Sequence, residues 1–144
     1  MDEHISWWFP GLEAGLETLP EDAPFFRACA ENCLSHGTLE LYKKLQTDTG
    51  GTPDAFFTAL GQLEGVDAEI LESGLTYRLI FKTCTCTLHG CGYVNTPALC
   101  RCSRASILRT LEALWPNHAA AVEMERTILG GAAECSFRIS LRQV

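Results

Sequence analysis

The chain has 144 residues, of which 47% are hydrophobic and 20% are charged, and its formal net charge is −7. This composition is that of one ordinary globular domain with enough apolar side chains to bury a core. The acidic balance argues against nucleic acid and against an anionic membrane surface as partners, because both attract basic proteins.

The start of the chain, from Met1 to His4, is acidic and lacks the basic first segment of a signal peptide. The sequence also has no apolar run of the roughly 18 residues that a membrane-spanning helix needs. We therefore expect a cytoplasmic protein. In that compartment, cysteines are reduced or bound to metal more often than they are paired in disulfides.

We expect residues 1–144 to form a single domain with three parts: an N-terminal arm at 1–20, a helical part at 21–64, and a cysteine-rich α+β part at 65–144. The arm carries Trp7, Trp8 and Phe9 just before Pro10, followed by a short helical pattern from Leu12. These aromatic side chains either pack onto the body of the protein or form the contact of a homodimer, since aromatics are enriched in interfaces.

The helical part begins with a predicted helix near Asp22, with Pro24 in its first turn. Further helices are expected from Thr38 and from Thr52. Four side chains of the first helix share one face at spacings of three and four residues: Phe25, Cys29, Cys33 and His36. This face is either a stripe that points to the core or a second thiol pair with an imidazole.

After residue 67 the hydrophobic period changes from helical to alternating. Segments 68–71 and 75–86 read as a hairpin around Gly74, and a helix capped by Ser103 is expected to run to Trp115. Segments 122–129 and 135–141 read as a second hairpin around Gly130. The sequence thus predicts an α+β fold: an antiparallel sheet of about four strands, with N-terminal helices and one helix between two hairpins packed on it.

The final strand alternates strictly. Cys135, Phe137, Ile139 and Leu141 are expected to face the core, and Ser136, Arg138, Ser140 and Arg142 to face solvent. On the preceding strand, Glu123 and Glu125 are expected to pair with Arg138 or Arg142. The more economical interpretation of these charges is a surface ladder of ion pairs, not a catalytic carboxylate.

Five of the eight cysteines fall between positions 84 and 102. Cys84 and Cys86 form one Cys-x-Cys pair, which an extended segment presents on a single face, and Cys100 and Cys102 form another. The connection between them contains loop-forming Gly, Asn and Pro residues that can fold one pair over the other. Four such thiolates suit zinc or an iron–sulfur cluster, with Cys91 and His89 as spare ligands.

Two other interpretations of this window stay open: reactive or redox-active thiols, and inert cysteines that act as small apolar side chains. If the strand continues unbroken, Cys84 and Cys86 lie beside Lys82 and Arg78. A helix that starts at Ser103 places its positive end next to Cys100 and Cys102. Cations and helix N-termini both stabilise thiolate, so we expect a depressed pKa for at least one of these thiols.

The final hairpin also carries a family resemblance. The run from Glu123 through Glu125, Thr127, Gly131, Cys135 and Phe137 to Ile139 resembles the closing signature of vinyl-reductase-like, hydrocarbon-binding domains, in a cysteine-rich bacterial branch. Thiazoline-carboxylate hydrolase-like proteins share this ending. The resemblance covers about residues 65–144 and implies a small ligand-binding domain whose zinc ligands include a Glu and cysteines near the hairpin.

Of that implied zinc set, only Cys135 carries over directly, because Thr127 stands where the family has its hairpin cysteine. The expected metal site therefore shifts to the Cys84–Cys102 window, with Cys135 as a helper. The full candidate set consists of Cys84, Cys86, Cys91, Cys100, Cys102, Cys135 and His89. The metal is expected to be a zinc ion, with an iron–sulfur cluster as the alternative.

Three functions follow as hypotheses. The first is a small-molecule-binding or sensing domain with a cysteine-ligated metal, whose ligand is a small apolar or aromatic molecule. The second is a thiol-dependent enzyme or redox protein with His89 as base. The third is a dimeric interaction module that uses the aromatic arm. An apolar cavity favours the first, an open thiol beside His89 the second, and a paired arm the third.

Overall fold

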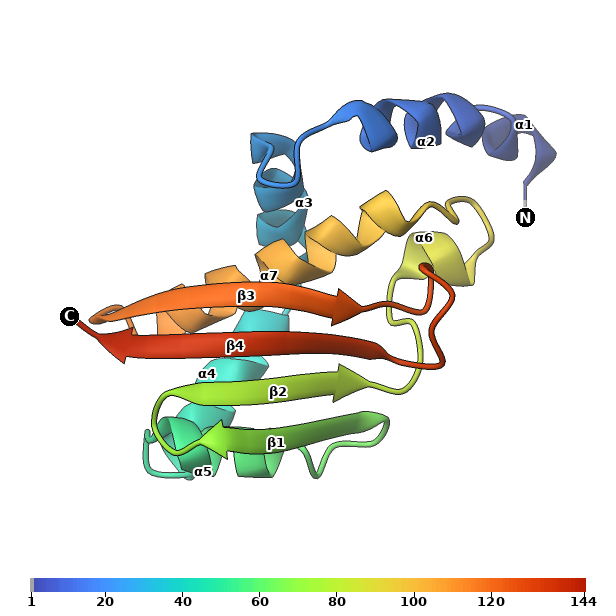
Figure 1. The fold of residues 1–144 in the computed structure, drawn as a ribbon. Coiled ribbons are helices and arrows are strands. Elements are labelled where there is room, and N and C mark those ends of the chain that lie inside the picture. The colour runs from blue at the N-terminus through green and yellow to red at the C-terminus, as the bar shows by residue number, and fades with distance from the viewer. Residues whose placement is uncertain (1) are drawn as a thin grey trace.

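The computed structural model describes residues 2–144. Helices make up the first part of the chain, and the sheet follows (Figure 1). The elements in order are α1 (Glu3–Ser6), α2 (Phe9–Thr18), α3 (Pro24–Leu34), α4 (Thr38–Asp48), α5 (Pro53–Leu60), β1 (Val66–Glu72), β2 (Thr76–Phe81), α6 (Thr87–Gly90), the 3-10 turn η1 (Pro97–Leu99), α7 (Cys100–Leu114), β3 (His118–Arg126) and β4 (Cys135–Gln143).

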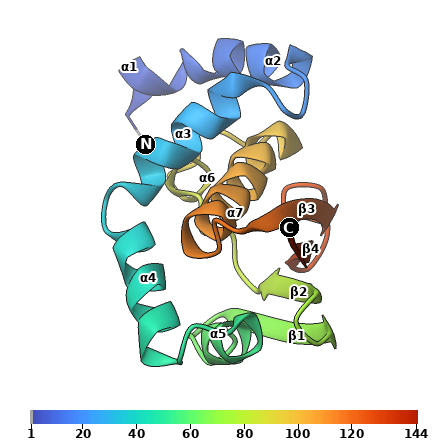
Figure 2. The ribbon, with the colours of Figure 1, turned by 90° about the vertical axis from the view of Figure 1, so that its left-hand side faces the viewer.

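The four strands form one antiparallel sheet in the order β1-β2-β4-β3. In the central pair, Tyr77 of β2 lies opposite Ile139 of β4. The helices gather on one side of this sheet, with α5 and α7 next to it and α3 beyond α7 (Figure 2). The predicted α+β class, the sheet of about four strands and the helix between two hairpins are confirmed. Within residues 2–144, no helix combines the length and apolarity that crossing a membrane would require.

Local sequence signals account for several element boundaries. Thr52 caps α5 by accepting a hydrogen bond from the Ala55 N–H, as expected from Thr-Pro at a helix start. Asp54 then accepts bonds from the Gly74 N–H at 2.9 Å and from the Tyr77 hydroxyl at 2.6 Å. The first turn of α5 is thereby tied to the turn of the β1–β2 hairpin.

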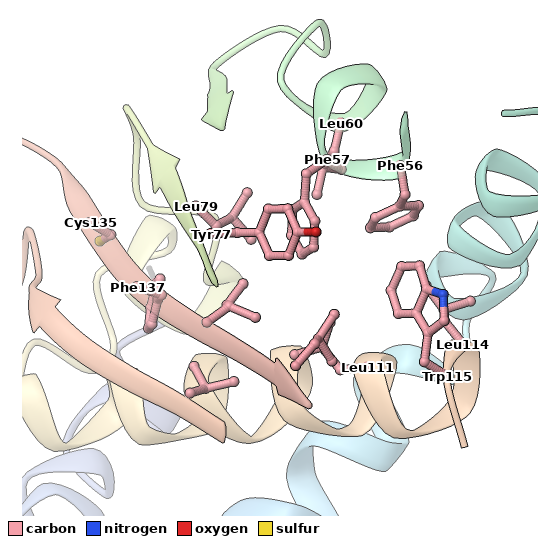
Figure 3. Packing of buried hydrophobic residues seen from close by; sticks show 13 residues of the cluster. Phe56, Phe57, Leu60, Tyr77, Leu79, Leu111, Leu114, Trp115, Cys135 and Phe137 are labelled. Atoms are coloured by element: carbon pink, nitrogen blue, oxygen red, sulfur yellow. The ribbon is translucent and has the colours of Figure 1, made fainter. Parts of the chain in front are cut away.

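The main core lies between the sheet and the helices α5 and α7 (Figure 3). Aromatic rings pack together at one end of it: Phe57 stacks on Tyr77 with the ring centroids 4.3 Å apart, and Phe56 meets Trp115 edge to face at 5.3 Å. The buried members of this cluster are Phe56, Phe57, Leu60, Tyr77, Leu79, Leu111, Leu114, Trp115, Val122, Cys135, Phe137, Ile139 and Leu141.

A second, smaller core joins the N-terminal helices to the segment before α7. Its buried members are Leu16, Ala23, Phe26, Val94, Ala98 and Leu99. Two ion pairs link α3 to α7, from Arg27 to Glu112 at 3.0 Å and from Arg109 to Glu31 at 2.7 Å. The first segment of the chain therefore packs as part of the helical layer.

Two predicted boundaries near the cysteines need correction. Strand β2 ends at Phe81, so Cys84 and Cys86 lie in coil and not on the strand. The sheet stops there because the Lys82 N–H bonds to the carbonyl of Gly65, just before β1 begins. Helix α7 starts at Cys100, which is before Ser103, because Thr96 caps the preceding turn η1 through the Ala98 N–H.

The final hairpin confirms most of the predicted alternation, with Phe137 and Ile139 buried and Arg138 exposed. Ser136 is the exception on the face that was expected to be exposed to solvent, because it is buried. Its hydroxyl donates a hydrogen bond to Glu125 at 2.8 Å. Glu125 pairs with Arg78 of β2 at 2.7 Å instead of with Arg138 or Arg142. The expected pairing was wrong because β4 has β2 as its other neighbour, and Arg78 reaches across.

The predicted helix face of Phe25, Cys29, Cys33 and His36 does not point to the core, and His36 lies in the turn after α3 ends at Leu34. The residues of α3 that are buried are Phe26, Ala30 and Leu34, while Phe25, Cys33 and His36 are exposed. Cys29 is half-buried at the boundary between the two faces. This leaves room for the second interpretation of the stripe, in which its cysteines belong to a thiol site.

Candidate functional site

All eight cysteines lie within residues 2–144 and carry free thiols. Seven of them influence one another's ionisation, which places them in one cluster although they come from distant parts of the sequence. We divide the cluster into an inner thiol group and an outer thiol group. The inner thiol group is Cys84, Cys86, Cys100 and Cys135, and the outer thiol group is Cys29, Cys33 and Cys102.

The inner thiol group is centred on Cys100, the buried first residue of α7. Burial raises the pKa of its thiol, a hydrogen bond with Thr127 offsets part of that rise, and the thiols of Cys135, Cys84 and Cys86 raise the pKa further. The Cys135 sulfur accepts a bond from the Ile128 N–H at 3.3 Å. The coil after β2, the start of α7 and the β3–β4 turn thus converge on these four thiols.

The outer thiol group joins α3 to α7. Burial raises the pKa of Cys102 to about 12, with further increases from the thiols of Cys29, Cys86 and Cys33. The Cys102 thiol also hydrogen-bonds to Cys29, which lowers the pKa of Cys29 against a larger rise from burial. Cys86 acts on both Cys100 and Cys102 and so lies between the two groups.

These directions contradict the expected thiolate at the start of α7. Burial and neighbouring thiols raise the pKa values of Cys100 and Cys102, and they outweigh the positive end of the helix. The expected cations are occupied elsewhere, with Lys82 paired to Asp67 and Arg78 paired to Glu69 and Glu125. In this arrangement the thiols are protonated near neutral pH.

The two spare ligands of the predicted set lie at α6. Cys91 is exposed at the C-terminal end of that helix. The His89 ring Nδ1 contacts the Val94 carbonyl at 3.3 Å and the Asn95 Oδ1 at 3.0 Å. His89 is therefore held within its own loop, where it orders the segment that leads to η1.

Among residues 2–144, no group of three or more His, Cys, Asp or Glu side chains is disposed to hold a metal ion. The donor chemistry of the inner thiol group fits a soft metal, because zinc and iron–sulfur clusters favour four thiolates. The positions of these side chains in the structure do not fit a metal site of four thiolates. Rotation of the cysteine side chains and adjustment of the coil at 82–86 would be needed to bring the sulfurs together.

A hollow of about 440 Å³ opens beside the inner thiol group. It lies between the start of α7 and the β3–β4 turn, and Thr127, the partner of Cys100, forms part of its wall. The other lining residues are Pro97, Ala98, Arg101, Met124, Glu125, Arg126, Gly130 and Ala132. This size is within the range of small-molecule pockets, roughly 300–1,000 Å³.

No model of a known protein family matches the sequence, and no curated protein matches it. Six chains of solved structures match. One is a trafficking protein particle complex subunit 3 from Naegleria fowleri, whose crystal structure has palmitic acid covalently bound. That chain is 12% identical, the TM-score is 0.52, and the match covers 98% of this chain and 95% of that one. The similarity shows the fold alone, a small α+β domain with a four-stranded sheet.

A second hollow, of about 600 Å³, lies on the N-terminal helices, far along the sequence from the cysteine window. Trp7 and Trp8 stand at its edge and are 72% and 58% exposed. The lining residues are Trp7, Trp8, Gly11, Leu12, Gly15, Leu16, Leu19 and Phe25. We call this surface the tryptophan groove.

The sequence placed five of the seven clustered thiols in one candidate site, together with Cys91 and His89: these five are Cys84, Cys86, Cys100, Cys102 and Cys135. It left open whether Cys29 and Cys33 belong to that site. The spacing of four residues between Cys29 and Cys33 was the available signal, since it puts both on one face of a helix. These cysteines come near α7 only because α3 packs along α7. No local pattern in the sequence reveals this packing.

Proposed function

We propose that this protein is a small ligand-binding or sensing domain whose site is the inner thiol group, with a soft metal ion, zinc first, bound by Cys84, Cys86, Cys100 and Cys135. The observation that carries the proposal is the convergence of these four thiols from three separate segments of the chain. Inert cysteines have no reason to gather in this way, whereas a tetrathiolate site needs it.

The ionisation of the thiols supports the same proposal. The thiols of Cys84, Cys86 and Cys135 disfavour a negative charge on Cys100, and that of Cys84 disfavours one on Cys135, so burial and these neighbours raise the pKa of both Cys100 and Cys135. A divalent cation reverses this balance, because ligation requires deprotonated thiols and releases their protons. Metal affinity should therefore rise steeply with pH.

The hollow beside Cys100 is the proposed place for a small apolar or aromatic molecule. Two likenesses support this ligand class: the resemblance of the final hairpin to vinyl-reductase-like, hydrocarbon-binding domains, and the fold shared with a trafficking subunit that carries palmitic acid. A ligand in this hollow contacts Thr127 and Ala98, which adjoin Cys100. Occupancy of the hollow would thus be sensed at the thiols. Reduced thiols are consistent with a cytoplasmic location.

The test of the metal proposal is elemental analysis and visible absorption of protein purified without air, followed by titration of the reduced protein with Zn²⁺ against a chromophoric chelator. We expect about one zinc per chain, with release by a strong chelator. An absorption band in the visible region together with iron would assign the site to an iron–sulfur cluster. Reduced protein that contains no metal and binds none would overturn the proposal.

Variants localise the site. The double variant Cys84→Ser and Cys100→Ser should lose zinc binding, since only two thiolates of the inner thiol group remain. Cys91→Ser is the matched control, because it removes a cysteine from the same window that is exposed and outside the group. Equal losses in both variants would show that the ligands are not the inner thiol group.

A second proposed function is dimerisation through the tryptophan groove, with a second copy of this chain as the partner. Gly11 and Gly15 lie one helical turn apart in the groove, and an added Cβ would meet nothing within 4 Å at either one. Trp7 and Trp8 project from the same surface. A surface that carries bulky side chains next to a hollow can match a copy of itself across a two-fold axis.

The fold neighbour belongs to a multi-subunit particle, which is compatible with a protein partner at such a surface. The test is the oligomeric state, measured by analytical ultracentrifugation over a range of concentrations. The double variant Trp7→Ala and Trp8→Ala should shift the protein to monomer, while Leu41→Ala, an exposed apolar side chain on α4, should not. A wild-type protein that is monomeric at high concentration would overturn this second proposal.

A further inference from the structure

Two arginines and one glutamate line the hollow beside the inner thiol group. The hollow opens where the start of α7 and the β3–β4 turn come together at one end of the sheet (Figure 1). Arg101 lines it from α7, and Glu125 and Arg126 line it from the end of β3. The chain as a whole has a formal net charge of −7. The charges around this hollow therefore indicate what kind of molecule it takes.

The two charged side chains of β3 already have partners within the protein. Glu125 lies 2.7 Å from Arg78, which also pairs with Glu69 of β1 at 2.9 Å. Arg126 pairs with Glu134 of the β3–β4 turn at 2.7 Å. Because these ion pairs satisfy the charges of Glu125 and Arg126, neither side chain is the main attraction for a ligand.

Arg101 differs from the other arginines of its helix. Its guanidinium donates to the Leu19 carbonyl at 2.6 Å, and the guanidinium carbon lies 5.8 Å from the centroid of the Phe26 ring. These contacts fix the guanidinium without neutralising it, since neither partner carries a net charge. Within residues 2–144, Arg101 takes part in no ion pair, whereas Arg104 and Arg109 of α7 each have a carboxylate partner.

Apolar side chains supply another part of the wall. Pro97 and Ala98 lie in the turn before α7, and Met124 and Ala132 come from β3 and the turn that follows it. Ala98 is also a buried member of the smaller core, which holds this part of the wall in place. An apolar wall next to one unpaired cation suits a molecule with an apolar body and a single negative charge.

We infer that the ligand of this hollow is a small organic acid, whose carboxylate is bound by the Arg101 guanidinium and whose apolar or aromatic body lies against Ala98, Met124 and Ala132. The inference rests on the proposed function, which takes the hollow as the ligand site, and it adds the charge of the ligand. A guanidinium can present two N–H groups to one carboxylate, and Arg101 keeps such donors beyond the one that Leu19 accepts.

The same surroundings disfavour a more highly charged ligand. The Glu125 carboxylate lines the hollow and repels anions, so each further negative charge on the ligand adds to the repulsion. Arg126 is a second cation, but Glu134 already shares its charge. A carboxylic acid with one charge and an apolar body should therefore bind better than phosphate, which has more charge and no apolar body.

The experiment compares three probes at pH 7 with the reduced protein: benzoate, benzamide and inorganic phosphate. Benzamide has the ring without the charge, and benzoic acid is ionised at this pH. Heteronuclear NMR follows the backbone amides of Ala98, Gly130 and Ala132 during each titration. We expect benzoate to shift these amides with a Kd at least ~10-fold lower than that of benzamide, and lower than that of phosphate.

Variants assign the charge to one residue. Arg101→Gln should raise the Kd for benzoate at least ~10-fold and leave that for benzamide unchanged. Arg109→Gln is the matched control, because it removes the same charge from the same helix at a position that does not line the hollow, and it should change the Kd less than ~2-fold. If circular dichroism shows that Arg101→Gln is unfolded, the comparison of benzoate with benzamide on the wild-type protein decides.

The outcomes separate this inference from the function on which it rests. Equal affinities for benzoate and benzamide at the amides of the hollow would overturn the inference and leave the hollow as the site of a neutral ligand. Benzoate that binds Arg101→Gln as tightly as the wild type, or phosphate that binds as tightly as benzoate, would also overturn it. If no probe shifts these amides, the ligand part of the proposed function fails as well. The zinc content of each sample tests the metal part separately.

Discussion

At the Trp115 end of the main core, large aromatic rings from several elements pack on one another, whereas the other end holds the thiol of Cys135 next to Phe137 (Figure 3). The aromatic end is fastened further by the bonds of Asp54 to Gly74 and Tyr77. The thiol end instead relies on coil at 82–86, a short helix and small side chains. The difference shows where the fold supplies its own stability and where the proposed metal would add to it.

The largest expected effect comes from the aromatic end. Phe57 is only 1% exposed and stacks on both Tyr77 and Trp115. Phe57→Ala should lower the free energy of unfolding by ~3–5 kcal/mol, because it removes a buried ring and leaves a cavity. Urea denaturation measures this change. Leu41→Ala, which alters an exposed side chain, is the control and should stay within about 0.5 kcal/mol of the wild type.

If Phe57→Ala costs less than about 1 kcal/mol, the aromatic end is not the main source of stability, and the comparison between the two ends fails. If zinc raises the free energy of unfolding of Phe57→Ala by the same amount as that of the wild type, the two ends contribute independently. The separation of their residues leads us to expect this result.

The next largest effect concerns the hydrogen bonds that Asp54 accepts at the same end of the core. Tyr77 has no exposed surface, and its hydroxyl donates to Asp54 at 2.6 Å. Tyr77→Phe removes this bond with little change of shape, and should cost about 1–2 kcal/mol. The pKa of Asp54 is lowered by bonds from Ser73, Tyr77 and Gly74, so it should rise in the variant, which NMR titration detects. An unchanged pKa of Asp54 would show that the bond contributes little.

The sequence predicted the aromatic end well because its signals are local. Thr52-Pro53 started α5, Gly74 turned the first hairpin, and the alternation around Phe137 and Ile139 identified the buried face of β4. These features depend on the spacing of residues within a single element, and this spacing is visible in the sequence. The antiparallel sheet and the helix between its hairpins followed from their order.

The thiol end was predicted less well because its geometry depends on packing between elements. The strand expected to carry Cys84 and Cys86 ends at Phe81, since its partner β1 begins only at Val66. The expected thiolate at the start of α7 fails because burial raises the pKa values of Cys100 and Cys102. Neither the end of a sheet nor the burial of a helix start is encoded in nearby residues.

That correction leads to a kinetic prediction for the thiol end. With the pKa of Cys102 near 12 and that of Cys100 raised, both thiols should react with iodoacetamide at least ~10-fold more slowly than the exposed Cys33 at pH 8. Mass spectrometry of quenched time points gives the rate at each site. The reduced, metal-free protein is the correct sample, because zinc would slow the reaction for another reason.

Equal labelling rates at Cys33 and Cys102 in the folded, metal-free protein would contradict the burial of the outer thiol group. Such a result would favour the thiol-dependent enzyme hypothesis, in which a cysteine near the start of α7 is activated. A rate at Cys102 that rises to that of Cys33 only in urea would confirm that burial is the cause.

The smallest expected effect concerns the ion pair of Glu125 with Arg78 on the sheet, beside the hollow that Glu125 helps to line. Glu125 accepts bonds from Arg78 and Ser136, and chiefly the bond from Arg78 lowers its pKa to about 2. A lowered pKa stabilises the folded state at every pH above the unfolded value of ~4.3, and this contribution is lost as the pH falls through about 2.

Glu125→Gln should therefore lower the melting temperature by at most about 2–4 °C at pH 7, since the pair keeps contact with solvent. The gap to the wild type should be constant from pH 7 to about pH 5 and close between about pH 5 and pH 2, whereas Glu123→Gln, the exposed control on the same strand, should show no such closure. A gap for Glu125→Gln that does not change with pH would mean that packing against Ser136, and not the charge, is what the carboxylate contributes.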